Sequence, residues 1–199
     1  MRPQPLLSTL LYILLLTACT PTAHQRDAMR QLLDSADQQN RAFIPFTSDS
    51  ALTRAVRFYD TYGTHNERMR AHYLLGCVYR DLGEAPQALQ CYHDAADCAD
   101  TTAADCDYRL LCRVHGQIAD VFKMQKMPYR EIDDTQQAIH YAYLAHDTLA
   151  ALSNMEYLMG TYCVLGNYEK QLLLSSTIYK EYQRLHQPRL AVASLFTLS

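Results

Sequence analysis

Small and aromatic residues recur together along the chain in a pattern typical of packed helices. Ala and Tyr return at short intervals, whereas runs of Val and Ile are few, and no stretch alternates apolar and polar residues as a half-buried strand does. Closely crossing helices use Ala at their contacts, and Tyr fills the wider gaps between them. The pattern therefore predicts an all-α fold.

One segment, between Met69 and Asp100, shows this order of small and large residues most clearly. Gly76 and Ala88 suit a close crossing of two antiparallel helices, with tyrosines beside the crossing. Gly83 is expected to end the first helix with a left-handed residue, a conformation that Gly adopts without steric cost. The positions that define the pattern are Leu75, Gly76, Tyr79, Leu82, Gly83, Ala88, Tyr92 and Ala95.

These positions resemble the consensus of the tetratricopeptide repeat (TPR) family. In that consensus Leu-Gly and Tyr precede a turn Gly, and Ala, an aromatic residue and Ala follow it. The resemblance implies an α-solenoid of antiparallel helix pairs. It also implies that a protein or peptide partner lies in a concave groove lined by the first helix of each repeat.

The resemblance places six residues of the clear repeat in that groove: Arg70, Tyr73, Leu74, Cys77, Arg80 and Asp81. One family subtype clamps a C-terminal carboxylate with Lys, Arg and Asn at such positions. Here Tyr73, Leu74 and Cys77 replace most of them, so that subtype is disfavoured. One aromatic residue and two cations remain, which suit a peptide with apolar and acidic side chains. Arg70 and Arg80 can also be read as solvated charges on a helix face.

Weaker copies of the unit extend over most of the chain. The second unit is longer than the family period of about 34 residues, and its extra residues are expected in loops at Thr101–Asp105 and Gln125–Asp134. The second copy is marked by Ile118, Ala119, Phe122, Ala138, Ala142 and Ala145, and the third by Leu158, Tyr162, Leu165, Gly166 and Asn167. The expected organisation is a short tether at 20–24, a helical pair at 25–66, and repeats at 67–100, 105–150, 151–185 and, in part, 186–199.

The N-terminus has the layout of a secretory leader, with Arg2 followed by an apolar run from Leu6 to Leu16. The run is too short for a permanent bilayer-crossing helix, which takes about 20 residues. Its end, Leu16-Thr17-Ala18-Cys19, resembles the lipobox of bacterial lipoproteins, which implies cleavage of residues 1–18 and acylation of Cys19. An ordinary leader would instead leave a soluble periplasmic protein.

The lipobox implies a lipid-anchored protein at the cell envelope. In the sorting rule of enteric bacteria, Asp after the acylated cysteine retains a lipoprotein in the inner membrane, and Thr20 stands there. The outer membrane, facing the periplasm or the cell surface, is therefore favoured over the inner membrane. The chain has 18 Lys and Arg against 21 Asp and Glu, and only Arg2 of these lies in the leader. This mildly acidic balance argues against a nucleic-acid partner, which needs a basic face.

Cysteine and histidine give no clear chemical site. Six cysteines follow Cys19, and they can be read as disulfides, with Cys98–Cys106 one conceivable bridge, or as small buried residues. Neither Cys-x-x-Cys nor His-Glu-x-x-His is present, so no metal or cofactor is expected. Gly-x-Ser-x-Gly, Ser-x-x-Lys and phosphate-binding glycine loops are also missing, which indicates that the chain is not an enzyme.

The preferred interpretation is a lipid-anchored scaffold that binds a protein or peptide partner. The alternative is the sensor portion of a longer signalling or regulatory protein, because residues 190–198 look like the first helix of a repeat that lacks its second helix. That ending suggests a longer natural protein or a truncated copy, although the last helix could also lie in the groove. A glycan-binding protein is less favoured because the chain has no Trp.

Overall fold

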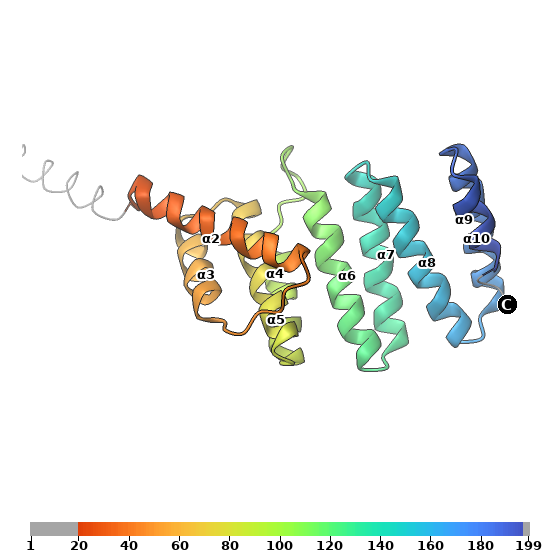
Figure 1. Ribbon diagram of the computed structural model, residues 1–199, viewed down its shortest axis with the longest axis horizontal. Coiled ribbons are helices and arrows are strands. Elements are labelled where there is room, and N and C mark those ends of the chain that lie inside the picture. Colours follow the sequence, from red (N-terminus) through yellow and green to blue (C-terminus); the bar gives the residue numbers. More distant parts are fainter. Residues whose placement is uncertain (1–19, 197–199) are drawn as a thin grey trace, which may run out of the picture.

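The computed structural model describes residues 20–196, with side chains up to residue 194, and this part of the chain is helical without any strand. The expected all-α fold is confirmed. From α3 onward consecutive helices run antiparallel along the array, and α2 crosses in front of α3 and α4 (Figure 1). The helices are α2 (Ala23–Arg41), α3 (Ser50–Tyr62), α4 (His65–Asp81), α5 (Ala85–Asp97), α6 (Tyr108–Met124), α7 (Pro128–Leu144), α8 (Thr148–Val164), α9 (Tyr168–Arg184) and α10 (Pro188–Phe196).

The leader and Cys19 lie outside the described residues, so cleavage and acylation remain predictions. In the described part, none of the helices has the length and apolar content needed to span a membrane. Helix α2 begins at Ala23, capped by Thr22, whose side chain accepts a hydrogen bond from the Gln25 backbone N–H at 3.2 Å. Because the helix starts there, the stretch between Cys19 and the first helix is shorter than the expected tether at 20–24.

The turns between helices repeat one geometry. After α4, Gly83 has a φ of 78°, its N–H donates to the Arg80 carbonyl at 3.1 Å, and the next N–H donates to the Tyr79 carbonyl at 2.8 Å. The expected left-handed end at Gly83 is therefore confirmed. The same bonds and a positive φ recur at Lys126, His146, Gly166 and His186. From α6 onward a new helix begins every 20 residues, at 108, 128, 148, 168 and 188.

The expected insertion at Gln125–Asp134 is wrong. Only residues 125–127 connect α6 to α7, and Pro128 is the first residue of α7. The extra length within this repeat lies in α7, which has 17 residues against 13 in α5, whereas α6 and α4 both have 17. The other expected insertion, Thr101–Asp105, does lie in the connection between α5 and α6.

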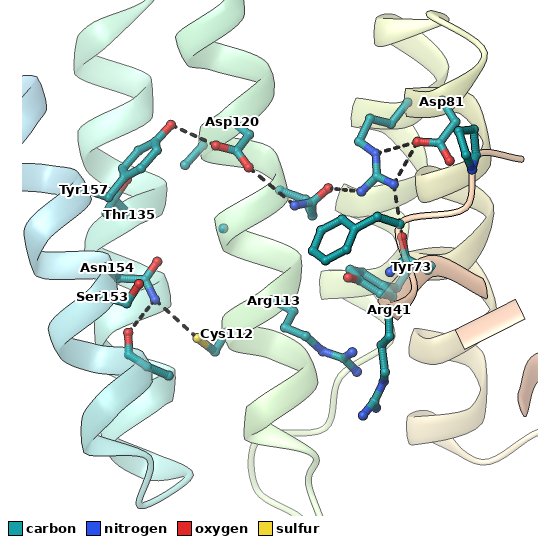
Figure 2. Close-up of a pocket in the computed structure, with 18 of the residues that line it drawn as sticks. Arg41, Tyr73, Asp81, Cys112, Arg113, Asp120, Thr135, Ser153, Asn154 and Tyr157 are labelled. Atoms are coloured by element: carbon teal, nitrogen blue, oxygen red, sulfur yellow. Dashed lines mark hydrogen bonds and ion pairs between the residues drawn. The ribbon is translucent and has the colours of Figure 1, made fainter. Parts of the chain in front are cut away.

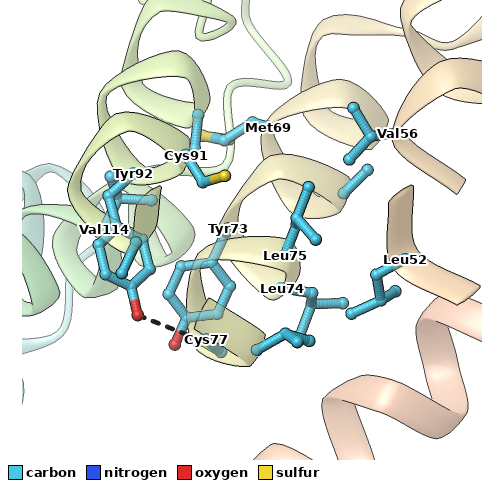
Figure 3. Close-up of a cluster of buried hydrophobic side chains, with 14 of the residues drawn as sticks. Leu52, Val56, Met69, Tyr73, Leu74, Leu75, Cys77, Cys91, Tyr92 and Val114 are labelled. Carbon is cyan, nitrogen blue, oxygen red and sulfur yellow. Dashed lines mark hydrogen bonds between the residues drawn. The ribbon is translucent and has the colours of Figure 1, made fainter. Parts of the chain in front are cut away.

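The core is continuous from α2 to α6, and within it Gly76 on α4 lies closely against Tyr92 on α5. Tyr92 is fully buried, and a Cβ placed on Gly76 would lie 2.5 Å from the Cε1 atom of its ring. The Tyr92 hydroxyl donates to Gln117 Oε1 at 3.2 Å and reaches Cys77 Sγ at 3.8 Å (Figure 3). Ala88 is also fully buried. Gly at position 76 is therefore required by the packing of a large ring between the two helices.

All six cysteines of the described part carry free thiols, so the conceivable Cys98–Cys106 disulfide is not formed in this structure. Cys77, Cys91 and Cys112 are buried in the helix contacts. Burial, with Asp94 nearby, raises the pKa of Cys91 to about 11, which keeps its thiol protonated and unreactive at neutral pH. These thiols thus serve as small apolar residues in the core.

Candidate binding groove

A hollow of about 1000 Å³ opens on the face of the array formed by α4, α6 and α8 (Figure 2). The end of α2 and the loop after it close one side. We call this hollow the groove. Its lining residues are Asn40, Arg41, Phe43, Ile44 and Pro45 from α2 and its loop, Tyr73, Arg80 and Asp81 from α4, Cys112, Arg113, Gly116, Gln117, Ala119 and Asp120 from α6, Thr135 from α7, and Ala150, Ser153, Asn154 and Tyr157 from α8.

The six residues expected in the groove separate into three groups. Tyr73, Arg80 and Asp81 are in its lining, but Tyr73 is only 4% exposed and offers a partner little of its ring. Arg70 lies outside the lining and bonds Asp34 and Asp37 of α2. Leu74 and Cys77 are fully buried and present no surface to a partner, because Leu74 packs toward α3 and Cys77 lies beneath the Tyr92 hydroxyl (Figure 3).

Arg80 is part of the wall of the groove, and its charge is already engaged by other residues of the chain. Its guanidinium donates to Asp81 Oδ1 at 2.9 Å, to Gln117 Oε1 at 2.7 Å and to Asn40 Oδ1 at 3.0 Å. Asp81 in turn accepts the backbone N–H of Phe46 at 3.0 Å. These bonds join α2, α4, α6 and the loop after α2. Because its donors are satisfied within the chain, Arg80 fixes the shape of the groove and has little left for a partner.

Asp37 on α2 holds three arginines from three helices. Its carboxylate lies 2.8 Å from Arg41, 3.5 Å from Arg70 on α4 and 3.4 Å from Arg113 on α6. Burial alone would raise the pKa of Asp37, but the hydrogen bond from Arg41 and the charges of Arg113 and Arg70 outweigh burial and hold the pKa below its ordinary value. With Asp34 also paired to Arg70, two carboxylates face three guanidinium groups, so this side of the groove keeps an excess of positive charge.

Gly116 leaves the floor of the groove open. It lies in the middle of α6, where Gly is less favourable than Ala by about 1 kcal/mol. A Cβ placed there would meet only Asn154 Oδ1, at 4.0 Å, so nothing inside the chain requires Gly at this position. The floor of the groove therefore has no side chain over this part of α6.

The side of the groove on α8 offers aromatic and hydrogen-bonding groups. The Tyr157 hydroxyl donates to Asp120 Oδ1 at 3.0 Å, and the Lys123 ammonium lies 4.1 Å from the centre of the Tyr157 ring. Burial and the nearby Asp120 carboxylate raise the pKa of Tyr157, so its hydroxyl stays protonated. On the opposite rim Phe43 and Ile44 are 92% and 56% exposed. The groove thus combines cations, hydrogen-bonding groups and apolar contacts, which is the mixture that an extended peptide can use.

Sequence reasoning missed Phe43, Ile44, Gly116 and Tyr157. Phe43 and Ile44 lie in a loop that has no recognisable motif. Tyr157 lies on the first helix of the third unit, whose match to the repeat consensus is too weak to show which of its residues face the groove. Gly116 did give a signal, since a glycine inside an amphipathic helix needs a reason. In the part of the chain that the structure describes, no three His, Cys, Asp or Glu side chains are grouped to hold a metal ion.

Two crystal structures of a Podosopora anserina protein, described as a kinesin light chain with nearly identical TPR-like repeats, share this architecture. One superposes with a TM-score of 0.60 over 86% of this chain and 93% of that chain, at 12% sequence identity. A point variant of the same protein gives a TM-score of 0.59, also at 12% identity, over 86% and 92% of the two chains. The fold is a TPR-like α-solenoid. This likeness shows the fold alone, and no family model and no curated protein matches the sequence.

Proposed function

We propose that this protein is a lipid-anchored TPR-like scaffold that holds a protein or peptide partner in the groove at the cell envelope. TPR-like repeats commonly serve as protein-interaction scaffolds. The observation that carries the proposal for this chain is the open floor at Gly116, within a hollow of about 1000 Å³. Because Gly116 adds no side chain to the floor of this hollow, a side chain of a partner has room over the α6 backbone there.

The charges and exposure of the lining favour an extended partner with acidic and apolar side chains. Arg41 and Arg113 keep 65% and 36% of their side chains exposed although both contact Asp37. An acidic group of the partner would relieve the excess positive charge of this cluster. Apolar side chains of the partner would contact Phe43 and Ile44 and enter the space over Gly116.

The anchor in this proposal is acylated Cys19, and two or three acyl chains there would hold the protein at the membrane permanently, because each buried methylene contributes about 0.8 kcal/mol. The outer membrane, facing the periplasm or the surface, is the favoured location because Thr20 replaces the retention Asp. The anchor and the groove are separate parts of the proposal, so one experiment with two substitutions can test each.

In a bacterial host, Cys19→Ser is expected to release the protein from the membrane fraction, whereas Gly116→Leu leaves it there. A tagged full chain is expected to co-isolate with a partner that Gly116→Leu loses by at least about tenfold, the loss expected when a side chain fills a central contact. Leu173→Ala is the matched control, because Leu173 is 66% exposed on α9 and outside the groove lining. If the partner co-isolates with Gly116→Leu as strongly as with Leu173→Ala, the groove is not its binding site.

A further inference from the structure

The lining of the groove carries opposite charges at its two ends along α6. Arg113 and Asp120 both line the groove from this helix, and Gly116 lies between them. Because a helix rises about 1.5 Å per residue, their backbone positions are about 10 Å apart. Figure 2 shows Arg113 and Arg41 at one end and Asp120 beside Tyr157 at the other. A partner that lies along α6 therefore meets lining arginines first and a lining carboxylate last.

Two neutral donors hold the carboxylate of Asp120 in place. Its Oδ1 accepts the Tyr157 hydroxyl at 3.0 Å, and its Oδ2 accepts the side-chain amide of Gln117 at 3.4 Å. These bonds position the carboxylate without bringing a positive charge to it. A carboxylate offers about four lone-pair sites, so both oxygens can accept a further hydrogen bond. Asp120 is also exposed, which leaves it open to a partner.

Asp120 differs in this respect from the other carboxylate of the lining. Asp81 lies 2.8 Å from the Arg80 guanidinium, so the charges of these two residues cancel. Within the described residues, no ion pair includes Asp120. Lys123, one turn further along α6, is outside the lining, and its ammonium lies 4.1 Å from the centre of the Tyr157 ring. The negative charge of Asp120 is therefore available to a cation of the partner.

We infer that the groove selects a peptide segment with one acidic and one basic residue, the basic residue bound by Asp120 and the acidic residue lying at Arg113. An extended chain advances about 3.3 Å per residue, so a separation of about 10 Å corresponds to about three residues. The residue between the two charges would lie over Gly116. The inference rests on the proposed function, because it takes the partner to be an extended peptide, and it adds the charge pattern and the orientation of that peptide along α6.

Opposite charges at the two ends exclude partners as well as attract them. A segment with acidic residues only would place one of them against Asp120, and a segment with basic residues only would place one against Arg41 and Arg113. Each juxtaposition of like charges weakens binding, so the repulsive contacts sharpen the choice made by the attractive ones. A reversed segment would meet like charges at both ends. The charge pattern therefore also decides which way round the segment lies.

Selection of short random peptides displayed on phage, with the purified full chain as target, tests this pattern. The wild type is expected to enrich peptides with an acidic and a basic residue about three positions apart. Asp120→Lys is expected to lose the basic residue from its selected peptides. Glu169→Lys is the matched control, because it makes the same change of charge at an exposed residue of α9 outside the lining, and it should select the wild-type pattern. Asp120→Asn keeps an acceptor for Tyr157, so a loss of the basic residue there as well reports the charge rather than the fold.

The most strongly selected wild-type peptide, made synthetically, gives the size of the effect by fluorescence anisotropy. Replacing its basic residue by Glu is expected to weaken binding to the wild type by about tenfold, because an attraction at Asp120 becomes a repulsion. The same replacement is expected to strengthen binding to Asp120→Lys. Selected peptides without a preference for a basic residue, or with the same preference on Asp120→Lys, overturn the inference. Failure of the wild type to enrich any peptide overturns it as well.

Binding of the same peptides to Gly116→Leu separates this inference from the proposed function. Peptides that bind Asp120→Lys unchanged but are lost on Gly116→Leu lie in the groove, so only the charge pattern would be wrong. Peptides that bind Gly116→Leu as strongly as the wild type lie outside the groove and contradict the inference and the proposed binding site together. The expected result is loss of the wild-type peptides on Gly116→Leu and weaker binding on Asp120→Lys.

Discussion

Gly76→Ala is expected to lower the free energy of unfolding by about 1–3 kcal/mol, because the added methyl overpacks a filled core. Its Cβ would lie 2.5 Å and 2.6 Å from two ring atoms of Tyr92, which is fully buried and held at its hydroxyl by Gln117. The ring can move away only by disturbing α4, α5 and α6 together. Urea unfolding followed by circular dichroism measures the loss directly.

Gly160→Ala is the matched control for this prediction. Gly160 also lies inside a helix, but a Cβ there has no neighbour within 4 Å, so Ala is expected to be neutral or stabilising by up to about 1 kcal/mol. Tyr92→Ala alone is expected to cost about 3–5 kcal/mol, and in that background Gly76→Ala should no longer destabilise. Equal effects of Ala at positions 76 and 160, or additive effects of the changes at 76 and 92, would show that the ring does not press on Gly76.

Asp37→Asn is expected to destabilise the protein by about 1–3 kcal/mol, because removal of a buried ion partner leaves three arginines without their shared carboxylate. The loss should be local at first, with faster amide hydrogen exchange in α2, since Asp37 ties that helix to α4 and α6. Asp34→Asn is the control. Asp34 is 58% exposed and pairs only with Arg70, so a change of at most about 1 kcal/mol is expected.

The Asp37 cluster also predicts a dependence on pH. Because the pKa of Asp37 is lowered in the folded protein, its contribution is complete above the ordinary Asp value of about 4. That contribution is lost as the pH falls from there through the lowered value, when the carboxylate takes up a proton. Amides of helix α2 should therefore lose protection from exchange as the pH falls below about 4 in the wild type, whereas Asp37→Asn should lack this part of the transition. An identical acid profile for both proteins would contradict the assignment to Asp37.

The sequence predicted the clear repeat well because its turn and crossing residues are the types that their conformations require. Gly83 takes the left-handed conformation, and Gly76 faces a large ring. The later turns were harder to place because Lys126, His146 and His186 adopt positive φ without being Gly. The expected insertion at Gln125–Asp134 followed from the family period of about 34 residues, whereas these helices are long enough for a repeat of 40.

The groove was predicted only in part because its shape depends on contacts between repeats. The expected face of α4 assumed an open surface, but α2 and α3 cover part of it, which buries Leu74 and engages Arg70. The salt bridges from Asp37 join residues far apart in the sequence, so the pattern within a single repeat cannot predict them. Tyr73 and Arg80 do lie in the lining, although whether they bind a partner stays a prediction, and the open floor at Gly116 became evident only with α8 beside it.

The central claim is that the groove, rather than the exposed surface of α9, contacts the partner. A photo-crosslinking amino acid placed at Phe43, at Ser153 or at Leu173 in living cells tests this most directly, since Phe43 and Ser153 line opposite sides of the groove and Leu173 lies exposed on α9. Irradiation is expected to give the same discrete adduct from positions 43 and 153 and none from position 173. An adduct from Leu173 alone, or equal adducts from all three positions, would contradict the account.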